Sequence, residues 1–236
     1  MQGSVGEHPR ESASKSYFDD WATSYDQGRV SPWFQYTQNL TIGLLQLDSS
    51  SRVLDVGCGT GYATIRLASQ LPAGKACGVD ISPGMIEQAR RKIPAPLKDR
   101  VEFHQGSSAA LGFPDGTFTH LICTNSFHHY PDPLGALREM KRVLAPGGQL
   151  AIFENAPDLS WYTWAWDRLL RIIEKGHVRY YPSRELGEMI RQAGYQPVEL
   201  CVLRNEFLKH GKLFASIQVW RAHKPRAGSE SRPAGR

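Results

Sequence analysis

The sequence predicts an α/β fold in which a doubly wound, mostly parallel sheet of seven strands carries helices on both faces. Short apolar runs bounded by glycine, proline or polar residues recur along the chain, as expected for strands that are buried on both faces. Stretches with helical spacing lie between these runs, and this alternation is typical of parallel sheets. The 236 residues, 41% of them hydrophobic, suffice for one domain with a sizeable core.

Five strands and three helices are predicted in the first two thirds of the chain. Four strands are apolar runs, at residues 53–56, 76–79, 121–123 and 150–153. A fifth, at residues 100–105, alternates apolar and polar side chains, which places it towards an edge of the sheet. Helices are expected at residues 64–71, 83–92 and 133–144. The second of these begins at Ser82 as N-cap, with Pro83 in its first turn.

The last third of the chain is expected to add two helices and two strands. Residues 159–173 place apolar side chains around nearly the whole circumference of a helix, which would need cover on more than one side. A further helix at residues 183–193 stops at Gly194. Residues 195–203 and 213–220 have the pattern of two strands joined by a polar connection.

The two ends of the chain are rich in serine, glycine, proline and charge. We expect residues 1–14 and 222–236 to be disordered, which leaves a single domain over residues 15–221. Residues 221–236 carry five basic residues and one acidic residue, so the formal charge of +5 leaves only +1 for residues 1–220. Such a body offers no evident basic face for phosphates, and we expect no nucleic-acid partner.

The cysteines and the hydropathy pattern favour a cytoplasmic protein. The cysteines lie too far apart in sequence to form a C-x-x-C or metal-ligand pair, so we expect free thiols and no metal: Cys58, Cys77, Cys123 and Cys201. The first residues lack the apolar segment of a signal peptide. No apolar run reaches the roughly 18 residues that a membrane span needs.

The most informative segment covers residues 53–61, where a buried strand leads into Gly57, Gly59 and Gly61 before a helix begins. Glycines in such a turn let a ligand approach the backbone, and the start of the helix presents free N–H groups to it. The next strand ends at Asp80, whose carboxylate can accept hydrogen bonds from both hydroxyls of a ribose. Together these features predict a cofactor that contains a nucleoside.

The glycine spacing distinguishes between nucleoside cofactors. Dinucleotide sites use G-x-G-x-x-G, whereas this chain has D-x-G-x-G-x-G, and the charge of Asp55 would repel a pyrophosphate but could help to hold an ammonium group. At this point the chain resembles the class I S-adenosylmethionine-dependent methyltransferases, and most closely their type 11, ubiquinone/menaquinone-biosynthesis-like branch. The resemblance covers about residues 15–220. It implies a Rossmann-like sheet, S-adenosylmethionine as cofactor and S-adenosylhomocysteine as product.

The resemblance also implies a set of cofactor contacts. Ile81 and Met85 would flank the adenine, and Ser107 lies where relatives often carry an aspartate that accepts from the adenine amine. A hydroxyl can still accept one hydrogen bond, which predicts weaker discrimination. The segment 17–26 is similar to the helix that caps the pocket, although Phe18 and Trp21 also fit a core-packing stripe. The expected cofactor residues are Tyr17, Tyr25, Asp55, Gly57, Cys58, Gly59, Thr60, Asp80, Ile81, Met85, Ser107, Ser108 and Asn125.

The acceptor is expected at the carboxyl end of the fourth strand, where open parallel sheets bind ligands. His128 and His129 follow that strand and are candidate general bases, with His128 preferred; the alternative for each is a histidine that shapes the pocket or caps a helix. The resemblance implies an acceptor lid at about residues 156–181, and its aromatic residues predict a small planar or apolar acceptor. The expected acceptor contacts are Trp21, Trp161, Trp164, Tyr180 and Tyr181. For Trp161, as for Trp166, a place in a core helix fits equally well.

Two alternatives to a small-molecule methyltransferase remain open. The same fold serves methyltransferases that act on RNA or protein. Enzymes that methylate base amines commonly show an Asn/Asp-Pro-Pro-aromatic turn after the fourth strand, whereas this chain has Asn125-Ser126-Phe127 there. A nucleotide-dependent oxidoreductase is the third class, and it would require NAD rather than S-adenosylmethionine to stabilise the fold.

Overall fold

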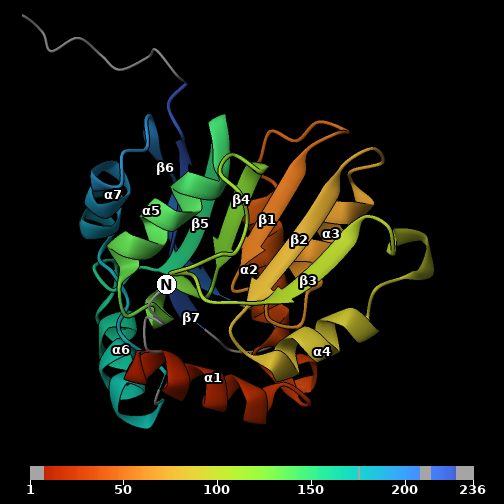
Figure 1. The fold of residues 1–236 in the computed structure, drawn as a ribbon. Helices are drawn as coiled ribbons and strands as arrows, with labels where there is room; N and C mark the ends of the chain where they lie inside the picture. The colour runs from red at the N-terminus through yellow and green to blue at the C-terminus, as the bar shows by residue number, and fades with distance from the viewer. Residues whose placement is uncertain (1–7, 175, 208–213, 227–236) are drawn as a thin grey trace, which may run out of the picture.

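The computed structural model describes residues 8–174, 176–207 and 214–226, and its seven-stranded sheet has helices on both faces (Figure 1). The strand order is β3-β2-β1-β4-β5-β7-β6. The first five strands pair in parallel, and β7 pairs antiparallel with both β5 and β6. The strands are β1 (Arg52–Val56), β2 (Lys75–Asp80), β3 (Val101–Gln105), β4 (Phe118–Thr124), β5 (Leu144–Asn155), β6 (Val198–Phe207) and β7 (Phe214–His223). This confirms the predicted doubly wound sheet and the edge position of the strand near residue 100.

The two faces of the sheet are covered by different helices. On one face, α5 (Pro133–Val143) and α7 (Ser183–Gln192) pack on side chains such as Leu54 and Leu121. On the other, α2 (Ser31–Ile42), α3 (Tyr62–Ser69) and α4 (Pro83–Arg91) cover side chains such as Val53 and Ile122. Because neighbouring strand residues point to opposite faces and both faces are buried, the central strands are apolar at nearly every position.

Helix starts follow from local capping. The Ser82 hydroxyl accepts a hydrogen bond from the Met85 N–H at 3.0 Å, as the predicted N-cap requires. Asp132 does the same for the Gly135 N–H at the start of α5. Helix α6 (Trp161–Ile173) begins after Ser160, whose side chain accepts from the backbone of Thr163. None of the helices in the described residues has the length and apolar character that a membrane crossing requires.

The expectation that residues 1–14 are disordered is wrong for the second half of that segment. Helix α1 (Pro9–Trp21) begins there, because the His8 side chain accepts a hydrogen bond from the Arg10 N–H and a proline occupies the first turn. At the other end β7 extends to His223, so the tail begins later than expected. The rest of both expected tails, residues 1–7 and 227–236, lies outside the described residues.

Helix α1 lies across the carboxyl ends of the parallel strands, and α6 lies beside it (Figure 1). The carboxylate of Asp19 on α1 holds the start of α4 by accepting from the Gly84 N–H at 2.9 Å and from the Ser82 hydroxyl at 2.5 Å. On α6 the predicted cover on several sides is wrong, because only Thr163, Asp167 and Leu170 are buried. Helix α1 thus covers the edge of the sheet at which ligands bind in such folds (Figure 1).

Candidate cofactor and acceptor site

A cavity lies at the carboxyl ends of β1, β2 and β4; its empty space is about 750 Å³, part of which is open to solvent. Its wall contains many of the residues that the sequence predicted for the cofactor or the acceptor: Tyr25, Gly57, Cys58, Gly59, Asp80, Ile81, Met85, Ser108, Asn125 and His129. It also contains residues that sequence reasoning did not assign to the cofactor, among them Glu11, Ser14, Gln38, Thr124, Ser126 and Tyr130. The wall therefore combines the glycine turn, the end of β2 and the helix α1.

The glycines of the turn after β1 serve different purposes. Gly57 has φ +76, and a Cβ there would stand 1.8 Å from the Ser126 Oγ. A Cβ on Gly61 would come within 2.5 Å of the Phe103 ring. Gly59 has φ +52, and a Cβ there would meet nothing within 4 Å. Gly57 and Gly61 are thus needed for packing, whereas Gly59 leaves the backbone open towards a ligand.

Asp80 connects the end of β2 to this turn. One carboxylate oxygen accepts from the Gly59 N–H at 2.8 Å and the other from the Ser82 N–H at 3.0 Å. Burial raises the pKa of the Asp80 carboxyl above its ordinary value. A carboxylate offers about four acceptor positions, so the two backbone contacts leave room for two ribose hydroxyls.

Buried acceptors on the β1 and β4 side of the site have no hydrogen-bond partner among the described residues. The Asp55 Oδ1 is one, while its Oδ2 accepts from the Thr64 hydroxyl at 2.7 Å. Burial raises the Asp55 pKa to about 7. Gln38 Oε1 and Thr124 Oγ1 are also without a partner, and both residues line the cavity, whereas Asp55 does not. Buried polar atoms of this kind fit a ligand that carries an ammonium group.

Aromatic residues of α1 and the following 3₁₀ helix η1 (Tyr25–Gln27) form a cluster beside the cavity. Tyr25 lines the cavity. Its ring is stacked on that of Phe34, with 5.3 Å between the ring centroids, and lies edge-on to that of Trp21, with 4.7 Å between the centroids. Phe18 also lines it and lies edge-on to His129 at 4.9 Å, so this position belongs to the cap of the cavity. Tyr17 packs on Phe18 and Trp21 and does not reach the wall.

Two predicted cofactor residues instead hold α1 and η1 in place. The Thr60 hydroxyl donates to Asp26 Oδ1 at 2.8 Å. The Ser107 hydroxyl donates to Glu11 Oε1 at 2.6 Å, and Glu11 itself lines the cavity. Neither Thr60 nor Ser107 lies on the wall, so direct cofactor contact from their side chains is not what the structure shows. A carboxylate from α1 stands beside the place where relatives often carry an aspartate.

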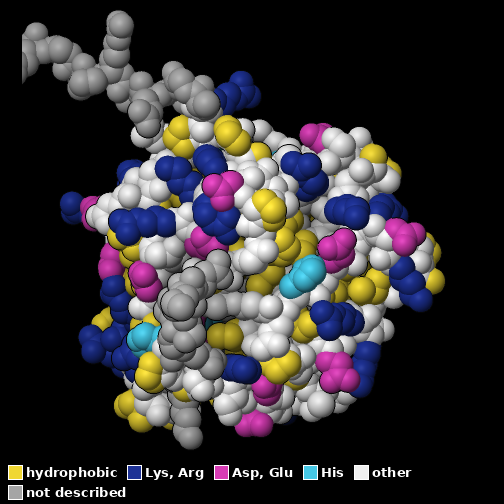
Figure 2. Space-filling view, in the orientation of Figure 1, with side chains coloured by type: hydrophobic (Ala, Val, Ile, Leu, Met, Phe, Trp, Pro, Cys, Tyr) yellow, Lys and Arg dark blue, Asp and Glu magenta, His cyan; other side chains and the backbone are white. Residues whose placement is uncertain are grey.

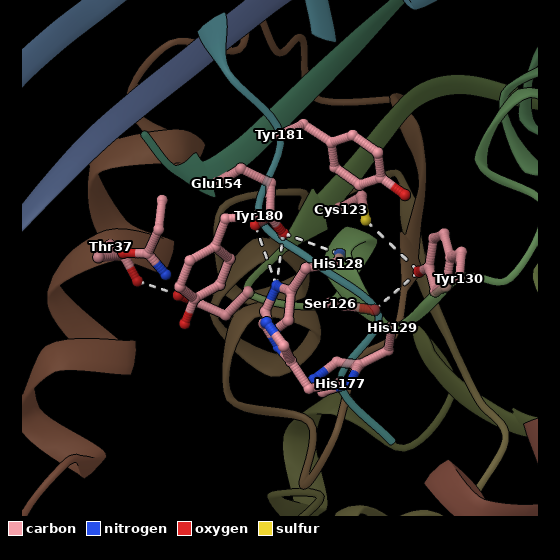
Figure 3. A network of polar contacts seen from close by, with 12 residues as sticks. Thr37, Cys123, Ser126, His128, His129, Tyr130, Glu154, His177, Tyr180 and Tyr181 are labelled. Carbon is pink, nitrogen blue, oxygen red and sulfur yellow. Dashed lines mark hydrogen bonds and ion pairs between the residues drawn. The ribbon is translucent and has the colours of Figure 1, made fainter. Parts of the chain in front are cut away.

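His128 forms a buried pair with Glu154 at the end of β5 (Figure 3). Its Nδ1 lies 2.9 Å from Glu154 Oε1 and 3.0 Å from Oε2, and its backbone N–H also donates to Oε1 at 3.3 Å. Burial raises the Glu154 pKa to about 8 and lowers the pKa of His128 well below its ordinary value. His128 does not line the cavity itself. It adjoins His129, which lines the cavity, and the centroids of the two rings are 4.1 Å apart.

His129 has a different set of partners. Its Nδ1 lies 3.0 Å from the Gly176 carbonyl oxygen, which makes Nδ1 the protonated nitrogen, and its Nε2 lies 3.6 Å from Glu174 Oε1. Burial lowers the pKa of His129 well below its ordinary value. Both histidines are therefore neutral near pH 7, as a general base must be before it accepts a proton.

The predicted lid residues divide into two groups. The rings of Tyr180 and His128 lie 4.9 Å apart, and Tyr181 is buried against Phe127 at 5.5 Å (Figure 3). Trp161 and Trp164 are 79% and 52% exposed on α6, and the structure does not bring them to the cavity. Contact between these tryptophans and an acceptor stays a prediction.

The sheet order, with its antiparallel last strand, and the cavity between the glycine turn and Asp80 define a Rossmann-like methyltransferase. A family model described as a methyltransferase domain matches residues 53–148. Over 190 residues the chain is 32% identical to 27-O-demethylrifamycin SV methyltransferase of Amycolatopsis mediterranei, covering 79% of this chain and 67% of that protein. Over 196 residues it is 30% identical to demethylmenaquinone methyltransferase of Lactococcus lactis, covering 74% and 75%.

The chain belongs to the class I S-adenosylmethionine-dependent methyltransferases, in their ubiquinone/menaquinone-biosynthesis-like branch. The solved structure of phosphoethanolamine N-methyltransferase 2 from Haemonchus contortus, in complex with phosphomonomethylethanolamine and S-adenosylhomocysteine, has the same fold. It superposes with a TM-score of 0.72 at 14% identity, covering 93% of this chain and 61% of that one. The cofactor is S-adenosylmethionine, and the oxidoreductase alternative is set aside.

Proposed function

We propose that this enzyme methylates a hydroxyl group on a small planar or apolar molecule, with His128 as the general base and Glu154 as the residue that orients it. The observation that carries the proposal is the buried His128–Glu154 pair, with Nδ1 at 2.9 and 3.0 Å from the two carboxylate oxygens. A hydroxyl is protonated at pH 7 and has to lose its proton during transfer, so such an acceptor needs a base.

The residues of the cavity suit the three parts of the cofactor, which supplies a methyl group already activated on a sulfonium. Asp80 would accept from the ribose hydroxyls, and Ile81 and Met85 would flank the adenine. The partnerless Gln38 Oε1 would accept from the ammonium group, and the positive charge of that group would favour the ionised form of the nearby Asp55 carboxyl, whose pKa is about 7. These assignments rest on the wall of the cavity and on the unpaired acceptors within it.

Glu11 would accept from the adenine amine. Its carboxylate lies on the cavity wall and already takes one hydrogen bond from the Ser107 hydroxyl. Since the Ser107 hydroxyl donates to Glu11, the acceptor positions that remain for the adenine amine are mainly those of the Glu11 carboxylate. The weaker discrimination expected from a serine would then be offset by an acid from α1.

In the His128–Glu154 pair, His128 removes the proton of the acceptor and Glu154 orients the imidazole ring. An ionised Glu154 accepts a hydrogen bond from the Nδ1–H of His128, which keeps the lone pair on Nε2, and that lone pair takes the proton of the acceptor. The Glu154 pKa of about 8 means that this form of the pair becomes populated as the pH rises through that value. We therefore expect turnover with a hydroxyl acceptor to rise with pH in the range from about 7 to 9.

The names of the relatives support a small acceptor over RNA or protein. One is named for 27-O-demethylrifamycin SV, a small molecule methylated at oxygen, and the other for demethylmenaquinone. Tyr180 and Phe18 provide aromatic surface on either side of the two histidines, which favours a planar acceptor.

The test is S-adenosylhomocysteine release with a panel of phenols, hydroquinones and thiols, for the natural chain and for His128→Asn and His129→Asn. His128→Asn should lower kcat with hydroxyl acceptors about 10²- to 10⁴-fold and leave the Kd for S-adenosylmethionine unchanged. His129→Asn should raise that Kd, because His129 lines the cofactor cavity. A normal kcat for His128→Asn with its best hydroxyl acceptor would overturn the assignment.

A further inference from the structure

The outer face of α6 is unusual for a helix on a protein surface. Its exposed residues are all either apolar or arginine: Trp161, Trp164, Trp166, Arg168, Leu169, Arg171, Ile172 and Ile173. Trp161 and Ile172 are 79% and 81% exposed, and they stand on the same side of the helix, about three turns apart. A surface helix normally turns charged and polar side chains to water, so an apolar face of this kind is a candidate for binding a partner.

Acidic side chains are turned away from this face, which from here on is called the α6 face. Asp167 is buried on the opposite side of the helix, where it accepts from the Tyr180 N–H at 2.6 Å and contacts His177 Nε2 at 2.9 Å. The side chain of Glu174, just after the helix, is only 14% exposed. Asp158, before the helix, accepts from Ser183. The Arg171 guanidinium donates to Asp167 Oδ2 at 2.5 Å, which offsets its charge. The α6 face is therefore apolar, and its positive charge is carried mainly by Arg168.

The helix is also held firmly enough to present this face. The Ser160 hydroxyl at its start contacts the Ser216 hydroxyl of β7 at 2.6 Å, and Thr163 accepts from the Ser216 N–H at 3.2 Å. On the surface the guanidinium of Arg168 lies over the Trp164 ring at 5.2 Å, so charge and aromatic surface are adjacent. Hydrophobic and basic side chains lie next to one another at the lower left of Figure 2, where Figure 1 places α6.

We propose that the α6 face docks on the surface of a lipid bilayer that contains anionic lipids. Tryptophan and aliphatic side chains with arginine among them are the composition of helices that lie in the plane of a membrane interface. The rings and aliphatic chains enter the boundary of headgroups and acyl chains, while the guanidinium of Arg168 binds a lipid phosphate. No membrane crossing is involved, in keeping with the helices of the described residues.

A second copy of the chain fits this face less well. In a two-fold dimer the same patch meets itself, so the positive charge of Arg168 in one copy would lie close to that of Arg168 in the other. The 13 residues of α6 extend over only about 20 Å, which is short for the roughly 800 Å² that each partner of a stable dimer buries. Anionic lipid satisfies the charge that self-association would leave opposed.

Docking at α6 would also bring the acceptor side of the enzyme close to the bilayer. The buried face of the same helix holds Tyr180 through Asp167, and Tyr180 lies against His128. An apolar acceptor dissolved in the membrane would then have a short path to the proposed base. This last step rests on the proposed function, whereas bilayer binding itself does not.

The test is flotation of the full chain with vesicles of phosphatidylcholine alone and of phosphatidylcholine with phosphatidylglycerol. We expect binding to the anionic vesicles that weakens with salt and little binding to the neutral ones. Ile172→Ser/Ile173→Ser should weaken binding about tenfold or more. The matched control Leu200→Ser/Leu203→Ser, at positions 39% and 40% exposed on β6, should bind like the natural chain.

Vesicle binding through the basic tail and self-association through the α6 face are the two alternatives to membrane docking. Arg232→Gln/Arg236→Gln in the tail should leave vesicle binding unchanged, and loss of binding there would assign it to the tail and overturn the proposal. Absence of binding to both vesicles, or equal binding by Ile172→Ser/Ile173→Ser, would also overturn it. Sedimentation equilibrium that shows a dimer which this variant converts to monomer would make the face a self-interface instead. An unchanged Kd for S-adenosylmethionine confirms that the variant is folded.

Discussion

Replacing Glu154 by glutamine should change how the stability of the enzyme depends on pH. The carboxyl is fully buried, and its burial raises the pKa from the ordinary 4.5 to about 8. The native state therefore holds this proton more tightly than the unfolded chain does. The stability that Glu154 contributes is complete below pH 4.5 and is lost as the pH rises through about 8. Glutamine, which does not ionise, removes this dependence.

The magnitude follows from the two pKa values. One pH unit corresponds to about 1.4 kcal/mol for each proton that the unfolded state releases and the native state retains. Between about pH 6 and pH 9 the carboxyl of the unfolded chain is ionised throughout, whereas the native carboxyl keeps its proton until the pH approaches about 8. The difference in bound protons therefore acts over about two pH units. The free energy of unfolding of the natural chain should consequently fall by about 2 to 3 kcal/mol relative to Glu154→Gln.

Urea unfolding followed by tryptophan fluorescence at about pH 6 and pH 9 measures this difference. Glu188→Gln is the matched control, because Glu188 is a half-exposed glutamate on α7, and it should follow the natural chain at both pH values. If the gap between the natural chain and Glu154→Gln is the same at both pH values, the buried Glu154 carboxyl does not retain its proton in the native state near neutral pH.

Two further substitutions test the cavity. Gly57→Ala should destabilise the fold by about 2 to 4 kcal/mol in urea unfolding, because its Cβ would clash with Ser126 at a φ of +76; a stability within error of the natural chain would refute the packing role. Glu11→Ala should raise the Kd for S-adenosylmethionine about 10- to 100-fold by calorimetry, while the neighbouring Ser12→Ala should not; equal values for both variants would remove Glu11 from the adenine site.

Most of the sheet could be predicted from the sequence, because strands buried on both faces are short apolar runs. Turn-forming residues separate each run from the next. Ser82 and Pro83 marked the start of α4 for the same local reason. The first half of α1 was missed because residues 9–14 are almost entirely polar and looked like a tail. Its start signal, a proline after a possible cap at His8, was present but short. Missing that helix start also meant missing Glu11.

The site was predictable where one strand end and the following turn decide it, and not where two distant segments meet. Gly59 and Asp80 lie together because neighbouring parallel strands end at the same edge. The partner of His128 is Glu154, from the next strand of the sheet, and only the pairing of β4 with β5 brings them together. Gln38 belongs to α2, a helix that the sequence did not reveal, although Ser31 and Pro32 mark its first turn.

Calorimetric titration of S-adenosylmethionine into the natural chain and into Asp80→Ala tests the central claim, that the glycine turn and Asp80 hold the nucleoside of the cofactor. The natural chain should bind one equivalent, and Asp80→Ala should lose about 2–3 kcal/mol, roughly a 30- to 150-fold rise in Kd. Circular dichroism should show that the variant is folded. No binding by the natural chain, or the same affinity for both proteins, would contradict this claim.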